Sequence, residues 1–193
     1  MRNVFAILVF ALAAFSCQSA KDQFSIKGSI AGVETGKVYL LKLVGEQPQS
    51  IDTADIVDGK FTFKGKMEIP DIRILRLDDQ SYFATFFLDN ANITVTANKD
   101  SLRTTKIIGS PTHDIFKIFI SEMEKLNKDG MALQEKYQNA MATNNTDVAQ
   151  KAEIDLKAMI ENNKVYTKNF VKEHSNSVVS AYITLYQLSS QID

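Results

Sequence analysis

The stretch Gly109-Ser110-Pro111-Thr112-His113-Asp114-Ile115-Phe116 decides the fold, because the spacing of apolar residues changes there from two to about 3.6. Ser110 is a natural helix N-cap, and Pro111 suits the first helical position, where no amide donor is needed. Asp114 falls in the first turn, where an acidic side chain favours the helix dipole. The sequence therefore predicts strands before this stretch and a helix after it.

Upstream of this stretch, from Phe24 to about Ile108, apolar and polar residues alternate in about eight short segments. Asp58-Gly59 separates two of them and is a strong hairpin signal, because both central residues of such a turn can take positive φ. The segments are residues 24–30, 38–43, 51–57, 61–65, 72–77, 83–88, 93–96 and 104–108. Short strands at this spacing favour an antiparallel sandwich or a partly open barrel.

Downstream, apolar residues recur at three- and four-residue steps in two long segments, which predicts a helical hairpin. A polar loop, Thr143-Asn144-Asn145-Thr146, separates the two helices, and Ser175-Asn176-Ser177 predicts the start of a third helix to about Ser190. One apolar stripe per helix leaves side chains exposed unless another surface covers them. We expect the hairpin to dock on the β-domain through Phe116 and Phe119.

The N-terminus has the pattern of a signal peptide, with Arg2 ahead of an apolar run that ends at Phe15. The run is shorter than the ~20 apolar residues of a membrane-spanning helix. Ala14-Phe15-Ser16-Cys17 resembles the lipobox of bacterial lipoproteins, so we expect cleavage before Cys17 and its lipidation. The alternative is ordinary signal-peptidase cleavage at the same bond, which leaves a soluble periplasmic protein. Either route exports the chain to the cell envelope, and lipidation anchors it to the inner or outer membrane.

Together these patterns predict an α+β protein. An N-terminal antiparallel β-sandwich or partly open barrel of about eight strands precedes a long α-helical hairpin and a short third helix. The predicted parts are a signal peptide (1–16), a lipidated tether (17–22), a β-domain (23–109), and the hairpin with the C-terminal helix (110–193).

Composition and motifs exclude several classes of function. Without residues 1–16, the chain has 21 Lys and Arg against 23 Asp and Glu and no basic stripe, so we expect no nucleic-acid partner. Because Cys17 is the only cysteine, a disulfide within the chain and a dithiol redox cycle are both excluded. No Gly-rich phosphate loop or nucleophile elbow occurs. We therefore predict no catalytic residue, no cofactor and no metal.

Few polar residues are candidates for chemistry. His113 and His174 are the only histidines and lack a metal-ligand spacing, so we assign them neither a catalytic nor a metal role. Asp78-Asp79 and Asp89-Asn90 are typical of turns between strands. Such side chains also occur in calcium sites, but the Asp-x-Asp-x-Asp-Gly spacing is absent, which favours turns.

The aromatic cluster Tyr82-Phe83-Phe86-Phe87 has two interpretations, a ligand-binding face or a part of the core. Strand alternation places Phe83 and Phe87 on one side and Tyr82 and Phe86 on the other. We favour core packing for Phe83 and Phe87.

Several segments in order resemble a domain of unknown function found in envelope lipoproteins of Bacteroidetes. They are residues 24–30, 36–40, 58–65, 86–95 and 109–111, and the resemblance covers about residues 24–190. In that family the domain usually precedes a thioredoxin-like domain with a Trp-Cys-x-x-Cys motif, which has no counterpart here. The resemblance therefore implies an accessory or binding module at the envelope, or alternatively one half of a thiol:disulfide interchange system completed by a thioredoxin-like partner.

Two short sequences resemble the Asp-Ser/Thr-apolar signal for O-glycosylation in exported Bacteroidetes proteins. They are Asp52-Thr53-Ala54 and Asp100-Ser101-Leu102. Since Thr53 falls in a predicted strand, we favour Ser101 as the glycosylated residue.

Overall fold

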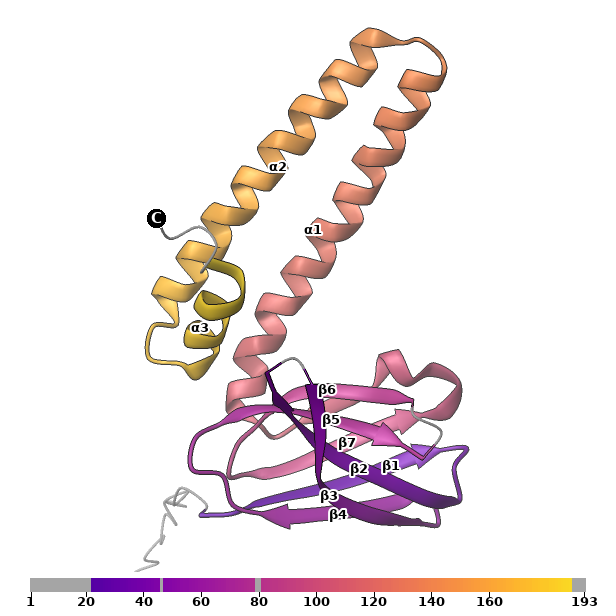
Figure 1. Cartoon of the computed structure of the whole chain (residues 1–193), viewed down its shortest axis with the longest axis vertical. Coiled ribbons are helices and arrows are strands. Elements are labelled where there is room, and N and C mark those ends of the chain that lie inside the picture. Colours follow the sequence, from indigo (N-terminus) through magenta and orange to yellow (C-terminus); the bar gives the residue numbers. More distant parts are fainter. Residues whose placement is uncertain (1–21, 46, 79–80, 189–193) are drawn as a thin grey trace, which may run out of the picture.

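The fold is known from a computed structural model that describes residues 22–45, 47–78 and 81–188. It consists of an eight-stranded sheet, a long helical hairpin and a short third helix, which confirms the predicted α+β class (Figure 1). The strands are β1 (Phe24–Ala31), β2 (Thr35–Val44), β3 (Gln47–Val57), β4 (Lys60–Gly65), β5 (Asp71–Leu77), β6 (Tyr82–Leu88), β7 (Asn92–Asn98) and β8 (Lys106–Ile108). The helices are the 3-10 helix η1 (Lys99–Thr104), α1 (Pro111–Ala142), α2 (Thr146–Glu173), α3 (Val178–Ile183) and the π-helical turn η2 (Thr184–Leu188). The predicted signal peptide and Cys17 lie outside the described residues.

The sheet has the strand order β6-β5-β2-β3-β4-β1-β7-β8 and curls into a nearly closed barrel (Figure 1). Its two ends, β6 and β8, are edge strands. The strand pairs are antiparallel, as predicted, with the exception of β1 and β7, which are parallel. β7 runs opposite to β6 after a tight turn. It lies beside β1, six positions from β6 in the strand order, and runs in the same direction as β1.

Two glycine–phenylalanine pairs hold β1 and β4 close together. Gly28 lies opposite Phe61, and Gly65 lies opposite Phe24. A Cβ atom on either glycine would collide with the facing ring, so only glycine fits beneath each Phe. The Asp58-Gly59 turn before β4 has φ values of 50° and 72°, which confirms the predicted hairpin.

A β-bulge in β6 divides the aromatic cluster between two cores. Tyr82 pairs with Arg76 and Ala84 pairs with Leu75, so Phe83 is an extra residue in β6. Phe83 therefore faces the barrel interior, whereas Phe87 packs under the helices. Both Phe residues are buried, as predicted, but the prediction that they share one side of the strand is wrong because it assumed unbroken alternation.

The helical hairpin docks on the β-domain at its base. The ring of Phe116 on α1 lies 5.1 Å from that of Phe87 on β6, and Phe119 is fully buried. These side chains form one apolar cluster with Ile72 of β5 and residues of α2 and α3. The predicted bridging role of Phe116 and Phe119 is thus confirmed. The N-cap is also as predicted, since Ser110 Oγ accepts a hydrogen bond from the His113 backbone N–H at 2.9 Å.

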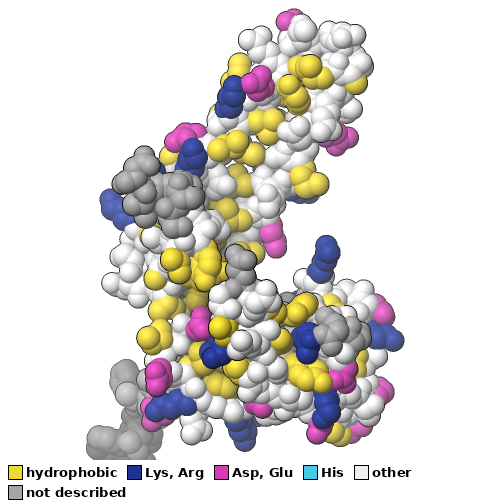
Figure 2. All heavy atoms as spheres, viewed as in Figure 1, with side chains coloured by type: hydrophobic (Ala, Val, Ile, Leu, Met, Phe, Trp, Pro, Cys, Tyr) yellow, Lys and Arg dark blue, Asp and Glu magenta, His cyan; other side chains and the backbone are white. Residues whose placement is uncertain are grey.

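Beyond its base the hairpin extends away from the barrel (Figure 1). Apolar side chains are exposed along it (Figure 2). The exposed apolar residues of the two helices include Ile118, Met131 and Ile154. The β-domain therefore covers only the proximal part of the stripes that the sequence predicts. None of the helices within the described residues is both long enough and apolar enough to span a membrane.

The third helix begins at the predicted N-cap, where Ser177 accepts a hydrogen bond from the backbone N–H of Val179. It does not continue as an α-helix towards Ser190, because α3 changes to the π-helical turn η2 after Ile183. At this junction the Thr184 hydroxyl donates to the carbonyl of Ser180 and competes with the regular backbone bond.

Candidate functional site

A groove lies along the seam where the barrel fails to close, between the edge strands β6 and β8. Helix α1 forms one of its walls, and the surface is indented in the angle between the hairpin and the β-domain (Figure 2). The groove has a volume of about 550 Å³, within the ~300–1,000 Å³ typical of ligand sites. We call it the seam groove; its lining residues are Phe83, Ala84, Thr85, Arg103, Thr105, Lys106, Ile107, Ile108, His113, Lys117, Ile120 and Glu124.

The seam is shut at one end by a network of hydrogen bonds around Asp89. Asp89 follows β6, is buried, and accepts hydrogen bonds from Ser110 Oγ at 2.6 Å, Thr112 Oγ1 at 2.6 Å and the Thr112 backbone N–H at 3.0 Å. These bonds join the end of β6 to the start of α1. The edge strand that faces β6 across the seam, β8, is only three residues long and does not pair with β6. The groove is therefore open along the rest of the seam.

The edge of β6 offers backbone groups to the groove. The carbonyl oxygen of Phe87 lies 2.9 Å from Ser110 Oγ, which shares its single hydroxyl proton between this oxygen and Asp89, so the carbonyl points away from β5. Because alternate residues of a strand direct their N–H and C=O groups to the same side, those of Thr85 also point away from β5. Thr85 is exposed and lines the groove, and no strand of the described sheet pairs with this edge.

His113 provides a buried polar group beside the apolar wall of the groove. Its side chain is 8% exposed and packs near Phe86 and Phe116. Nδ1 is buried and has no hydrogen-bond partner among the described residues. Burial lowers the pKa of His113 below its ordinary value of 6.5, and the charge of Lys117 lowers it further. The imidazole is therefore neutral at pH 7 and has one donor and one acceptor nitrogen.

The rim of the seam groove has an excess of positive charge. Arg103, Lys106 and Lys117 are basic, whereas Glu124 is the only acidic lining residue. Lys117 lies 3.8 Å from Asp114, an exposed pair that contributes little. Arg103 and Lys106 form no ion pair with any described residue. An anionic group bound here would therefore meet cations that are not already neutralised.

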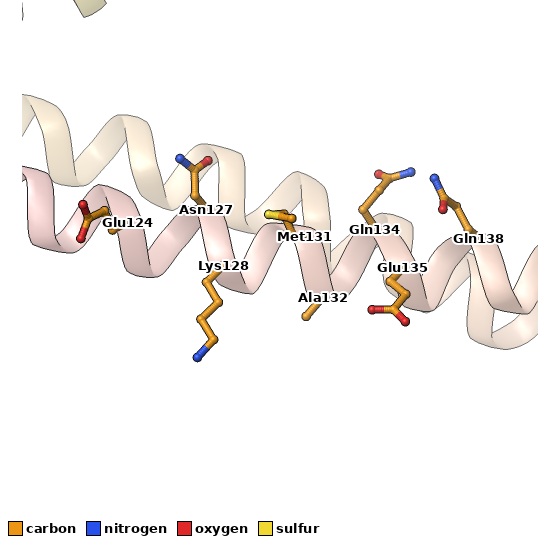
Figure 3. A pocket seen from close by; sticks show the side chains of 8 residues that line it. All are labelled: Glu124, Asn127, Lys128, Met131, Ala132, Gln134, Glu135 and Gln138. Carbon is orange, nitrogen blue, oxygen red and sulfur yellow. The ribbon is translucent and has the colours of Figure 1, made fainter. Parts of the chain in front are cut away.

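Two other hollows lack this combination. One runs along the exposed flank of α1, where Lys128 and Glu135 extend to one side of the helix and Asn127 and Gln138 to the other, so the side chains define no common centre (Figure 3). Another lies between Pro70, the start of α1 and the loop before α3, and has no strand edge in its lining. The seam groove is therefore the better candidate for a binding site.

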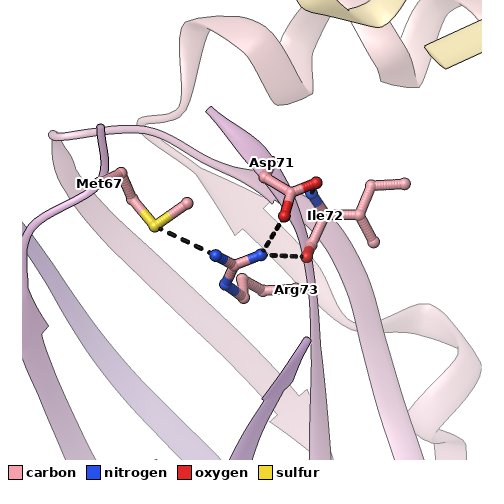
Figure 4. A network of polar contacts seen from close by, with 4 residues as sticks. All are labelled: Met67, Asp71, Ile72 and Arg73. Atoms are coloured by element: carbon pink, nitrogen blue, oxygen red, sulfur yellow. Dashed lines mark hydrogen bonds and ion pairs between the residues drawn. The ribbon is translucent and has the colours of Figure 1, made fainter. Parts of the chain in front are cut away.

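Arg73 forms a separate polar network at the end of the barrel (Figure 4). Its Nη1 donates to Asp71 Oδ2 and to the Ile72 carbonyl, both at 2.6 Å, and its Nη2 contacts Met67 Sδ at 3.4 Å. The side chain is 9% exposed, so these contacts compensate the burial of a charge. The network ties the loop before β5 to the strand, and it does not line the seam groove.

The other polar residues considered from the sequence have structural contacts. Asp78 accepts a hydrogen bond from the Lys37 backbone N–H at 2.7 Å. Asn90 exchanges two hydrogen bonds with the backbone of Met67. His174 caps the end of α2 and packs on Phe170, and no group of three potential metal ligands occurs within residues 22–45, 47–78 and 81–188. The sequence indicates a turn at Asp89 but not its hydrogen bonds to Ser110 and Thr112, because these partners lie 21 and 23 residues farther along the chain.

Ser101 lies in η1, close in sequence to the groove residue Arg103. Its side chain is exposed, and it has the non-helical dihedrals φ −148° and ψ 52°. Thr53 is also exposed but lies within β3, as the sequence predicts. Glycosylation of Ser101 stays a prediction, which the intact mass of the natively expressed protein would test.

Residues 24–116, from β1 into the first turns of α1, match the family model described as "Domain of unknown function (DUF4369)". This match confirms the resemblance of the β-domain to a domain of unknown function. Among solved structures, the chain is similar to a DUF3823 family protein from Bacteroides uniformis, with 14% identity and a TM-score of 0.22. That similarity covers 38% of this chain and 40% of the other. No curated protein matches the sequence.

Proposed function

We propose that this protein is a non-catalytic binding module of the bacterial cell envelope, and that the seam groove is its binding surface. One observation carries the proposal: the unpaired edge of β6, the apolar wall and the buried His113 all line the same groove. Ligand sites typically combine mainly apolar walls with a few directed polar groups. An exposed strand edge adds backbone donors and acceptors that can pair with an extended peptide.

The seam groove can be blocked selectively to test this function. A chain that begins at Gln18 has no cysteine, so Thr85→Cys introduces a unique thiol that a maleimide can modify. Peptides selected from a random library on the unmodified protein should lose binding once Cys at position 85 is labelled. The matched control is Asp129→Cys on the exposed side of α1, where labelling should leave binding unchanged. Equal binding after both labels would place the ligand elsewhere and overturn the proposal.

The proposed location rests on Cys17 and the apolar run before it. Two acyl chains at about 0.8 kcal/mol per buried methylene would hold the protein on a membrane far more firmly than one chain. We expect the natively expressed protein to partition into the detergent phase, and Cys17→Ser to leave unprocessed precursor or to release soluble protein. Unchanged partitioning of the variant would contradict lipidation.

A direct test distinguishes a non-catalytic module from the alternative, a protein that catalyses thiol:disulfide interchange. A chain that begins at Gln18 contains no thiol nucleophile. It should therefore not accelerate insulin reduction by dithiothreitol above the protein-free rate. A faster rate would contradict the non-redox function.

A further inference from the structure

We propose that the seam groove binds an extended peptide segment with acidic side chains, by adding it as a further strand to the free edge of β6. This inference rests on the proposed function and specifies the ligand of the same groove. Three features support it: the N–H and C=O groups of β6 that point into the groove, the apolar residues of the lining and the positive charge of the rim.

The backbone of β6 supplies the attachment. The carbonyl of Phe87 is occupied by Ser110, but Thr85 keeps its outward N–H and C=O groups without a strand partner in the described sheet. One strand added at this edge would form hydrogen bonds with both groups of Thr85. The position is shielded on one side, because Ile120 and Lys117 of α1 line the same groove.

The side chains around the groove select the sequence of the added strand. Successive residues of a strand point to opposite faces, so an extended segment presents its odd and even side chains to two different surroundings. Ile108 and Ile120 provide apolar surface, whereas Arg103, Lys106 and Lys117 provide positive charge. A segment that alternates apolar and acidic residues is complementary to the apolar surface on one face and to the positive charge on the other.

A second copy of this protein is a poorer occupant of the groove. Its own seam would bring an identical set of Arg103, Lys106 and Lys117 towards the first set, and like charges oppose such pairing. A flexible acidic segment of another exported protein has no such conflict.

The test measures the affinity of the chain from Gln18 onward for an eight-residue peptide that alternates Val and Glu. The same peptide with Lys in place of Glu is the ligand control. Thr85→Pro removes the outward N–H at an edge position that tolerates proline, and it should weaken binding about tenfold. Thr85→Val keeps that N–H, so it should lose much less affinity than Thr85→Pro. Lys106→Glu should weaken binding about three- to tenfold, whereas Lys151→Glu on the exposed side of α2 should not.

The outcomes separate this inference from the proposed function. Equal affinity for the Glu and Lys peptides, both sensitive to Thr85→Pro, would overturn the acidic preference but retain a peptide-binding groove. Equal affinity of the Thr85→Pro and Thr85→Val variants would overturn strand addition at β6. If Thr85→Pro loses the wild-type melting transition, the backbone test uses Val–Glu peptides that are N-methylated at alternate residues and so lack alternate N–H donors. Methylation in one of the two registers should weaken binding at least tenfold. Absence of any peptide binding at the groove would overturn both proposals.

Discussion

The carboxylate of Asp89 accepts a hydrogen bond from the hydroxyl of Ser110 at 2.6 Å, and this contact joins the first residue after β6 to the N-cap of α1. Ser110 in turn accepts from the backbone N–H of His113. The same few residues thus cap the helix, close one end of the barrel seam and place His113 beside the groove.

Removing the Asp89 carboxylate should destabilise the whole protein. Asp89→Ala leaves Ser110 and Thr112 without their shared acceptor in a buried position. Since hydrogen bonds to charged groups contribute ~1.5–3 kcal/mol, we expect the free energy of unfolding to fall by at least about 2 kcal/mol in urea titrations. Asp129→Ala, at an exposed position of α1, should change it by less than about 0.5 kcal/mol. Similar values for the two variants would contradict the role of Asp89.

Gly109 should not tolerate a side chain. Its φ is 102°, and an added Cβ would collide with the carbonyl oxygen of Asn92. Gly45 is a matched control, because its φ of 62° is also positive but no atom lies within 4 Å of the added Cβ. Gly45→Ala should lower the free energy of unfolding by about 1–2 kcal/mol, because of backbone strain alone. Gly109→Ala should lower it by more, because the collision with Asn92 adds to the strain. Thermal unfolding would measure both, and equal costs would show that the Asn92 contact is unimportant.

The lowered pKa of His113 predicts a specific dependence of stability on pH. Above the ordinary pKa of 6.5 the imidazole is neutral in both the folded and the unfolded protein. As the pH falls below 6.5, the unfolded chain binds a proton before the folded protein does, so the free energy of unfolding decreases until the lowered folded pKa is passed. Asp114 and Asp89 oppose this shift but do not reverse it.

Substitution of His113 isolates its contribution. His113→Phe, in a site already lined by Phe86 and Phe116, should reduce the loss of stability between pH 7 and pH 5. Urea unfolding at a series of pH values would measure the slope, with His174→Asn as the comparison. A slope that His113→Phe leaves unchanged would assign the pH dependence to other groups.

Phe119 should couple the hairpin to the β-domain. It is fully buried and belongs to the cluster that contains Ile72 and Phe87 of the sheet. Truncation of a buried Phe commonly costs about 3–5 kcal/mol, so Phe119→Ala should lower the stability of strands and helices in one cooperative transition. Ile118→Ala, at a side chain that is 57% exposed, should have a small effect. If residues 23–109 alone melted at the temperature of the full chain, the two parts would be independent.

The sequence predicts the local elements well because local rules govern them. The N-cap at Ser110 and the turn at Asp58-Gly59 follow from the chemistry of a few neighbouring residues. The parallel pairing of β1 with β7 and the bulge at Phe83 depend on how the whole sheet curls, which no short window contains. The seam groove was missed for the same reason: its lining combines residues of β6, β8 and α1 that meet only when the barrel forms.

The central claim, that the seam groove binds an extended segment at the edge of β6, is tested most directly by amide hydrogen exchange. The chain from Gln18 onward would be compared with and without a saturating Val–Glu peptide. We predict slower exchange in residues 83–87 of β6 and 105–108 around β8, because a new strand covers those backbone groups. Slower exchange confined to the distal hairpin, or no change in residues 83–87 despite bound peptide, would contradict the account.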